Sequence, residues 1–226
     1  MNILNNALSE NRFVLTEYEA KKVLADYGIP VTKEILVDNE TSLLGAVRNI
    51  GFPLVIKGCD PEYLHKTEKD LIRTDIRHEN EAVAAFHAIR TRMENAGDKV
   101  LVQEMILGKR ELAAGLIRDG QFGPTVMFGI GGIFAEIFND VAFRIAPLNK
   151  RDAFELMDEI RGRRILDAIR GMEPADREQL SDILIRIGKI GIENELIREI
   201  DLNPIIVSNG RGIAVDAMIL LESRQL

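Results

Sequence analysis

Polar side chains alternate with apolar ones near the end of the chain and could form a metal-binding face. Glu199, Asp201 and Asn203 are separated by single apolar residues, so a strand here places all three on one face. A turn at residues 209–210 would return the chain antiparallel and bring Asp216 to the same place. Such hard oxygen donors suit Mg²⁺ bridged to phosphates. A solvated acidic strand that stops at an Asn-Pro pair fits the same spacing equally well.

A group of glycines between two apolar segments could bind an anion. Gly129, Gly131 and Gly132 would let backbone N–H groups converge on a phosphate. The dinucleotide fingerprint fails, because Phe134 occupies its sixth position and a strand is expected to follow. Arg144 on the next strand would add a cation. A plain tight turn is the alternative interpretation.

Three further places in the first half of the chain could carry chemistry. Lys57 is expected to end a buried strand, where its ammonium either neutralises a phosphate in a cleft or reaches water. Gln103 and Glu104 end a later strand and suit either an adenine edge or a solvated strand terminus. His65 lies in a polar loop over residues 59–69. A loop histidine can act as a nucleophile or proton carrier, although an ordinary loop residue is the commoner case.

The composition excludes several classes of protein. The 226 residues include 29 Lys and Arg against 36 Asp and Glu, a net charge of -7 that argues against general nucleic-acid binding. No stretch approaches the roughly 18 apolar residues of a membrane span, and the N-terminus lacks the features of a secretory signal. The 1 cysteine, Cys59, excludes an internal disulfide. We therefore expect a cytoplasmic protein that binds neither nucleic acid nor membrane.

Helix and strand patterns place these residues in an α+β protein. Capping residues and apolar spacing predict helices over 16–27, 39–50, 79–95, 150–160 and 174–194. Alternating or continuous apolar runs predict strands over 33–37, 53–57, 71–76, 100–104, 111–118, 124–128, 133–139, 141–147, 196–207 and 213–219.

The order of these elements predicts two lobes that meet near Gly97. The smaller lobe is expected over about residues 22–97, and the larger over about 98–226 together with the N-terminal helix. A junction between lobes is a common place for a small-molecule site.

Taken in order, the motifs of the chain resemble those of the ATP-grasp family. In particular, they resemble the β subunits of ADP-forming acyl-CoA synthetases, and the resemblance runs from about Leu15 to Leu221. The motifs that carry it are Leu15-Thr-Glu-Tyr-Glu-Ala-Lys, Tyr27-Gly-Ile-Pro30, Pro61-Glu-Tyr-Leu-His65-Lys-Thr, Phe122-Gly-Pro-Thr-Val-Met-Phe-Gly-Ile-Gly-Gly132, Asp140-Val-Ala-Phe-Arg-Ile-Ala-Pro147 and Asp201-Leu-Asn-Pro204.

The resemblance implies a two-lobed ATP-grasp fold and a reversible reaction in which acyl-CoA, ADP and phosphate give a carboxylic acid, CoA and ATP. A separate CoA-binding α subunit would form the acyl phosphate, in an α2β2 assembly, and would determine which acid is used. His65 would then relay the phosphoryl group to ADP. Asn203 and Asp216 would hold Mg²⁺, with Asp201 close by as a catalytic group.

The resemblance also assigns the nucleotide contacts. It implies that Lys57 contacts nucleotide phosphate, that Gln103, Glu104 and Met105 form the adenine hinge, that Glu111 contacts the sugar or its surroundings, and that Gly129, Gly131, Gly132 and Arg144 complete the phosphate site.

The chain departs from the family at one place. Members commonly carry a Gly-Gly pair after the histidine loop, where this chain has Asp70-Leu71, which puts the mobility of that loop in question. Two other functions therefore stay open: a nucleotide-binding module without catalysis, and a ligase that joins a carboxylate to an amine without a phosphohistidine.

Overall fold

The chain folds into two units, each built on its own antiparallel sheet. The computed structural model describes residues 2–61, 70–93, 99–169 and 171–222. The small unit comprises Thr16–Tyr18 and Thr32–Met105, and the large unit comprises Met1–Leu15, Glu19–Val31 and Ile106–Leu226. These bounds differ from the expected lobes of 22–97 and 98–226, because residues 99–104 form a central strand of the small sheet.

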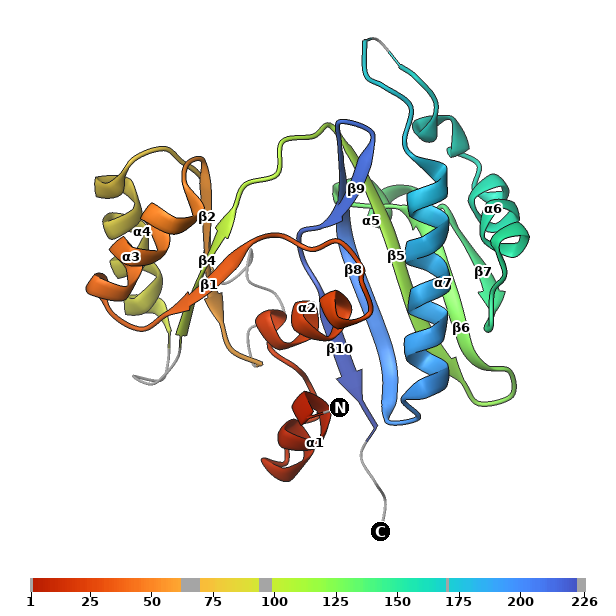
Figure 1. The fold of residues 1–226 in the computed structure, drawn as a ribbon, viewed down its shortest axis with the longest axis horizontal. Coiled ribbons are helices and arrows are strands. Elements are labelled where there is room, and N and C mark those ends of the chain that lie inside the picture. Colours follow the sequence, from red (N-terminus) through yellow and green to blue (C-terminus); the bar gives the residue numbers. More distant parts are fainter. Residues whose placement is uncertain (1, 62–69, 94–98, 170, 223–226) are drawn as a thin grey trace. The chain divides into compact units, whose positions relative to one another are not determined.

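The small unit is a four-stranded sheet with the order β1-β4-β2-β3. Its two helices, α3 and α4, lie side by side on one face of that sheet (Figure 1). An apolar core that includes Leu43, Ile56 and Phe86 lies between them and the sheet. The elements are β1 (Glu34–Val37), α3 (Glu40–Ile50), β2 (Leu54–Cys59), β3 (Ile72–Ile76), α4 (Glu79–Arg92) and β4 (Lys99–Glu104).

Local capping explains where both helices of the small unit begin. Asn39 accepts a hydrogen bond from the Ser42 N–H, and the Ser42 side chain completes a capping box. His78 caps α4 by accepting from the Glu81 N–H at 3.4 Å. Gly51 follows the last residue of α3 at φ 84°, which a glycine adopts without strain.

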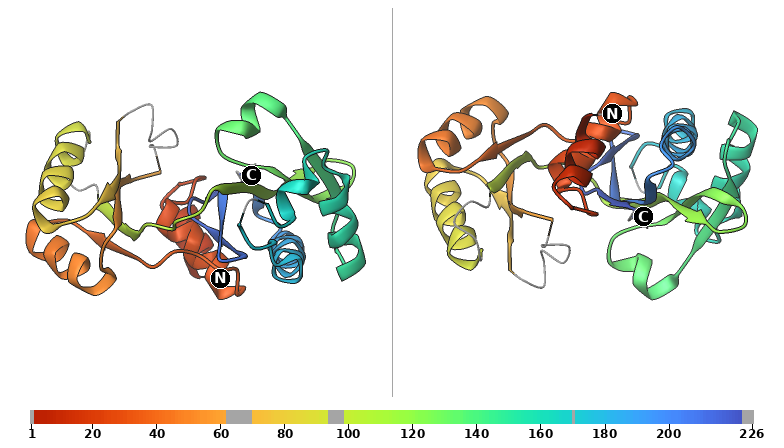
Figure 2. Two further views of the ribbon diagram at one scale, coloured as in Figure 1. Left: turned by 90° about the horizontal axis from the view of Figure 1, so that it is seen from above. Right: turned by 90° about the horizontal axis from the view of Figure 1, so that it is seen from below.

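The large unit is a sheet with the order β10-β8-β5-β6-β7, and β9 pairs with β8. Helices α6 and α7 cover one face of it, and Figure 2 shows α5 on the other side. The elements are α1 (Asn2–Ser9), α2 (Glu17–Asp26), β5 (Arg110–Asp119), β6 (Gly123–Ile130), α5 (Ile133–Phe138), β7 (Val141–Ile145), α6 (Lys150–Glu159), the 3-10 helix η1 (Arg163–Leu166), α7 (Arg177–Glu193), β8 (Ile197–Ser208), β9 (Arg211–Ala214) and β10 (Met218–Leu221). None of the described helices is long and apolar enough to cross a membrane.

Three elements differ from the sequence-based expectations. The strand predicted over 133–139 is wrong: the segment forms the short helix α5 after Gly132, whose φ of 61° turns the chain out of the sheet. The last strand, predicted over 213–219, is interrupted between β9 and β10. Helix α1 was not predicted, because its asparagines are poor helix formers.

Candidate functional site

The open face of β8 carries the alternating polar residues in the large unit. Ile200 and Leu202 are buried, at 2% and 0% exposure, in the core beneath the helices. Asp201 and its polar neighbours Glu199 and Asn203 therefore lie on the opposite face, as the alternation predicts. In register, Asp201 lies between Gly115 of β5 and Met218 of β10.

Negative charge accumulates around Asp201. Burial, together with the neighbouring charges of Glu199 and Asp216, raises the pKa of Asp201 to about 6. Asp216 lies in the break between β9 and β10, where its Oδ1 accepts a hydrogen bond from the Ala217 N–H at 2.8 Å. The predicted return of Asp216 to the Asp201 strand is thus seen in the large unit, and it leaves three carboxylates close together.

The glycine loop lies against two other polar residues of the large unit. The Gly132 N–H donates to Asn203 Oδ1 at 2.9 Å, and the Gly131 N–H donates to the Glu111 carbonyl at 2.9 Å. A Cβ atom on Gly132 would collide with the Glu111 carboxylate. Glu111, the two glycines and Asn203 therefore form one cluster, and α5, not a strand, follows the loop. The dinucleotide fingerprint still fails, because Phe134 occupies its sixth position and because β6 and β7 are antiparallel instead of forming a βαβ unit.

The donors on this face fit Mg²⁺ chemically. They are carboxylate and amide oxygens, the ligands that Mg²⁺ takes when nucleotide phosphates and water complete its octahedron. The pKa of Asp201 is raised mainly by burial and also by two neighbouring carboxylates, whose negative charge a cation would neutralise. Within the described residues, no group of three or more His, Cys, Asp or Glu side chains could by itself hold a metal ion. A cation here would therefore share its coordination with a bound phosphate.

Arg144 does not lie with this cluster. On β7 it shares a face with buried Ala142 and pairs with Glu159 of α6 at 2.7 Å. That is the helix-covered face of the sheet, opposite the one that carries Asp201. The expectation that Arg144 completes the phosphate site is therefore not met, because strand alternation directs its side chain to α6.

In the small unit, Lys57 is buried inside β2 instead of standing at a strand end. The strand continues through Gly58 and Cys59, and the Lys57 side chain is only 4% exposed. Its Nζ lies 2.7 Å from Oε1 of Glu17, whose side chain is 1% exposed. The alternative in which Lys57 extends into water is therefore wrong, and its ammonium belongs to a buried ion pair.

The expected adenine hinge lies at the end of β4 in the small unit. Gln103 is buried, at 2% exposure, and lies in register with Glu34 and Val55. The Glu104 carboxylate accepts from the Lys33 N–H at 2.7 Å, and the Met105 N–H donates to the Pro53 carbonyl at 3.1 Å. Glu104 and the Met105 N–H thus help to hold the sheet together.

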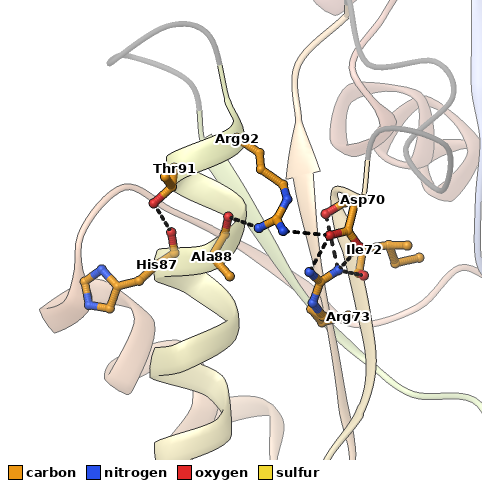
Figure 3. Close-up of polar contacts among 7 residues, drawn as sticks. All are labelled: Asp70, Ile72, Arg73, His87, Ala88, Thr91 and Arg92. Carbon is orange, nitrogen blue, oxygen red and sulfur yellow. Dashed lines mark hydrogen bonds and ion pairs between the residues drawn. The ribbon is translucent and has the colours of Figure 1, made fainter.

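His65 lies outside the described residues, but the residues that follow its segment are described. Asp70 has a φ of 55°, a conformation that Asp tolerates better than most side chains. Its carboxylate binds the Arg73 guanidinium at 2.6 and 2.8 Å and lies 3.0 Å from Arg92 (Figure 3). The hydrogen bond from Arg73 lowers the pKa of Asp70. The Asp70-Leu71 departure therefore places an ion-pair cluster where the family commonly has glycines.

Two buried residues of α2 were missed in the analysis of the sequence. Glu17 pairs with Lys57, and Lys21, at 1% exposure, donates from Nζ to the Val215 carbonyl at 2.9 Å, one residue before Asp216. Their spacing of four residues places both on one side of the helix. Two charged residues four positions apart on the predicted helix were the available signal.

Comparisons with known proteins identify the family of the chain. Residues 6–221 match the ATP-grasp domain family. The chain is 41% identical over 227 residues to the acetate–CoA ligase [ADP-forming] I subunit beta of Pyrococcus furiosus, covering 97% of this chain and 96% of that protein. An acetyl-coenzyme A synthetase 1 of Ca. Korarchaeum cryptofilum, solved with coenzyme A and Ca-AMPCP, is 42% identical. It has a TM-score of 0.93 and is matched over 98% of this chain and 99% of that chain.

A further structure of that synthetase bears on the chemistry. It contains coenzyme A and Mg-AMPPCP and has its phosphohistidine segment pointing towards the nucleotide-binding site; its TM-score to this chain is 0.87.

The chain belongs to the ATP-grasp family, and the predicted two-lobed ATP-grasp fold is confirmed. Within that family it groups with the β subunits of ADP-forming acetate–CoA ligases, as the resemblance of its motifs implied. Such a β subunit is one part of a multisubunit ligase and works with a separate α subunit.

Proposed function

We propose that this chain binds ADP or ATP with Mg²⁺ and exchanges a phosphoryl group with an acyl phosphate made on the α subunit. The observation that carries the proposal is the cluster on the open face of the large sheet. There the Gly132 N–H donates to Asn203, and the carboxylates of Glu199 and Asp216 lie near that of Asp201. Backbone N–H groups and a cation site side by side are what a nucleotide phosphate requires.

Individual roles follow from these positions. Asn203 and Asp216 would hold Mg²⁺, which neutralises phosphate charge when bound. Asp201, whose pKa is raised by burial and by two neighbouring carboxylates, would orient the group that receives the phosphoryl group. Glu111, with Gly129, Gly131 and Gly132, would line the sugar and phosphates in the large unit. Arg144 has no part in this proposal, because it pairs with Glu159.

The small unit would contribute the remaining nucleotide contacts. Lys57 would neutralise phosphate, and Gln103, Glu104 and Met105 would contact adenine through the groups that the sheet leaves available. His65 would carry the phosphoryl group between the acyl phosphate and the nucleotide, as a neutral imidazole can. An α2β2 assembly in the cytoplasm is the form in which we expect the enzyme to work.

The phosphohistidine relay can be tested with the purified chain. Mg²⁺ and ATP labelled at the γ-phosphate are expected to give a protein label that is stable in base and lost in acid. His65→Ala should abolish the label. His87→Ala is a matched control, because His87 is exposed on α4 and pairs with Glu40, so this variant should keep it.

The other outcomes identify the alternatives. Firm Mg²⁺-dependent nucleotide binding with no label, even with an α subunit present, would favour a module that binds nucleotide without catalysis. Turnover of a carboxylate and an amine by the His65→Ala variant would favour the ligase without a phosphohistidine. A label that survives in His65→Ala would contradict the assigned relay residue.

A further inference from the structure

A buried ion pair within the small unit joins Glu17 to the lysine proposed to bind phosphate. Glu17 is the first residue of α2, and Lys57 lies on β2 in register with Ile72 and Leu101. Their charged atoms are 2.7 Å apart, and both side chains are more than nine-tenths buried. Glu17 thus places a negative charge in direct contact with the Lys57 ammonium.

The chemistry of an ammonium allows it to bind a second anion. The Lys57 ammonium has three N–H donors, and one of them is directed at Glu17 Oε1. A phosphate that reached Nζ would share the ammonium with a carboxylate only a few ångströms away. Two anions that close repel each other strongly where water is excluded.

We propose that Glu17 is a positioning residue that holds the Lys57 ammonium in place and weakens its attraction for nucleotide phosphate. The inference rests on the proposed role of Lys57 in nucleotide binding. A free buried lysine would bind a phosphate more tightly, because its uncompensated charge would be neutralised only when nucleotide arrives. Glu17 removes this additional affinity, so the nucleotide can dissociate after phosphoryl transfer. Product release is the rate-limiting step of many enzymes.

The test compares nucleotide affinities of the full-length chain and the Glu17→Gln variant by calorimetry. Glutamine keeps the shape of the side chain and an oxygen acceptor but removes the charge. We expect MgADP to bind about tenfold more tightly to Glu17→Gln, because the Lys57 ammonium then no longer shares its charge with a carboxylate. Adenosine, which has no phosphate, should bind equally to both proteins.

Glu19→Gln is the matched control. Glu19 lies two residues along the same helix and binds Arg12 at 2.9 Å through both carboxylate oxygens, away from the Lys57 pair. Its loss should leave MgADP affinity unchanged. In a Lys57→Met background, Glu17→Gln should no longer tighten MgADP binding, because the charge that Glu17 offsets is absent.

Several results would overturn the inference. Unchanged or weaker MgADP binding by a folded Glu17→Gln variant means that the pair serves the fold alone. An equal gain for adenosine excludes the phosphate as the cause, and a gain that persists without Lys57 excludes an action of Glu17 through the Lys57 ammonium. Should Glu17→Gln not fold, Glu17→Asp draws the carboxylate back by one methylene while keeping its charge. It should tighten MgADP binding by less, and no tightening there also rejects the inference.

Failure of the proposed function gives a different pattern. A wild-type chain that binds no MgADP at all would contradict nucleotide binding itself. Wild-type binding with an unaltered affinity in Lys57→Met would instead remove Lys57 from the site and, with it, the role of Glu17.

Discussion

At the scale of single residues, the main feature is negative charge that gathers around the buried carboxylate of Asp201. Asp201 lies between two strands with Glu199 and Asp216 nearby, and burial and these neighbours raise its pKa to about 6. The folded chain therefore holds a proton on Asp201 at pH values where the unfolded chain has lost it. The contribution of Asp201 to the free energy of unfolding is therefore greatest below the ordinary pKa of an aspartate, near 4. This contribution is lost as the pH rises through 6.

Asp201→Asn should remove this pH dependence. Without Mg²⁺ at pH 7.5, the variant should be more stable than the wild type, by roughly 3 kcal/mol at most for a pKa displaced by about two units. At pH 4 the two proteins should differ much less, since Asp201 is protonated in the folded chain and about half protonated in the unfolded chain. Thermal denaturation in a chelating buffer at both pH values measures the difference. An equal effect at pH 4 and pH 7.5 would contradict the charge explanation.

The face on which the β8 side chains lie was predictable from the sequence. Which side chains of other elements meet them depends on strand register and on pairing between distant residues. Single apolar spacers place Asp201 and Asn203 on one face, and this was evident from the sequence. The same rule places Arg144 on the opposite face, but only after the registers of β6 and β7 are known. Glu17 and Lys57 are 40 residues apart in sequence, and no local pattern indicates that they meet.

At the scale of elements, one motif that carries the family resemblance begins with an aspartate that joins two elements. Asp140 precedes β7, is 8% exposed, and accepts hydrogen bonds from the Arg161 N–H at 2.8 Å and the Gly162 N–H at 2.7 Å. These donors lie just after α6 and have no helical partner of their own. The carboxylate therefore fixes the end of α6 against the start of β7.

Asp140→Ala should destabilise the large unit without altering nucleotide contacts. Loss of two hydrogen bonds to a buried carboxylate should cost about 2 to 3 kcal/mol. Urea unfolding followed by circular dichroism measures the loss, and Asp140→Asn, which retains one acceptor oxygen, should give an intermediate value. A variant as stable as the wild type would show that water replaces the carboxylate at no cost.

Element type was predicted well wherever the apolar period was long enough. The helices α6 and α7 and the strands β5 and β8 lie where their patterns predict them. The failure at α5 involves six residues, Ile133–Phe138, in which apolar residues fill nearly every position and no period is visible. There the backbone of Gly132 decides, because a positive φ turns the chain away from the sheet.

At the scale of the whole molecule, the two units have separate apolar cores. Ile56 lies in the small-unit core and Leu202 in the large-unit core, each at 0% exposure, and the two sets of core residues have no member in common. A cavity made in one core should therefore destabilise mainly the unit that contains it. The free energy of local unfolding can then differ between the two units.

Ile56→Ala should open the small unit selectively. The cavity should cost about 2 to 5 kcal/mol and speed amide hydrogen exchange in β1, β2 and β4. Exchange in β5 and β8 should stay as in the wild type, and Leu202→Ala should show the reverse pattern. Exchange that rises equally in both sheets after either substitution would show that the units unfold together.

The pairing of β1 with β4 makes the small unit exchangeable by genetic engineering. Residues 32–105 enter and leave side by side, because Glu34 pairs with Gln103 and Lys33 and Glu104 hydrogen-bond to each other. A segment whose two ends lie close together can be removed, or replaced by the segment of a relative, because the distance that the remaining chain must bridge is short. Residues 16–18 belong to the same unit and must be exchanged with it. Otherwise Glu17 of the host chain could lose the cation that Lys57 provides, which would leave its carboxylate buried without that partner.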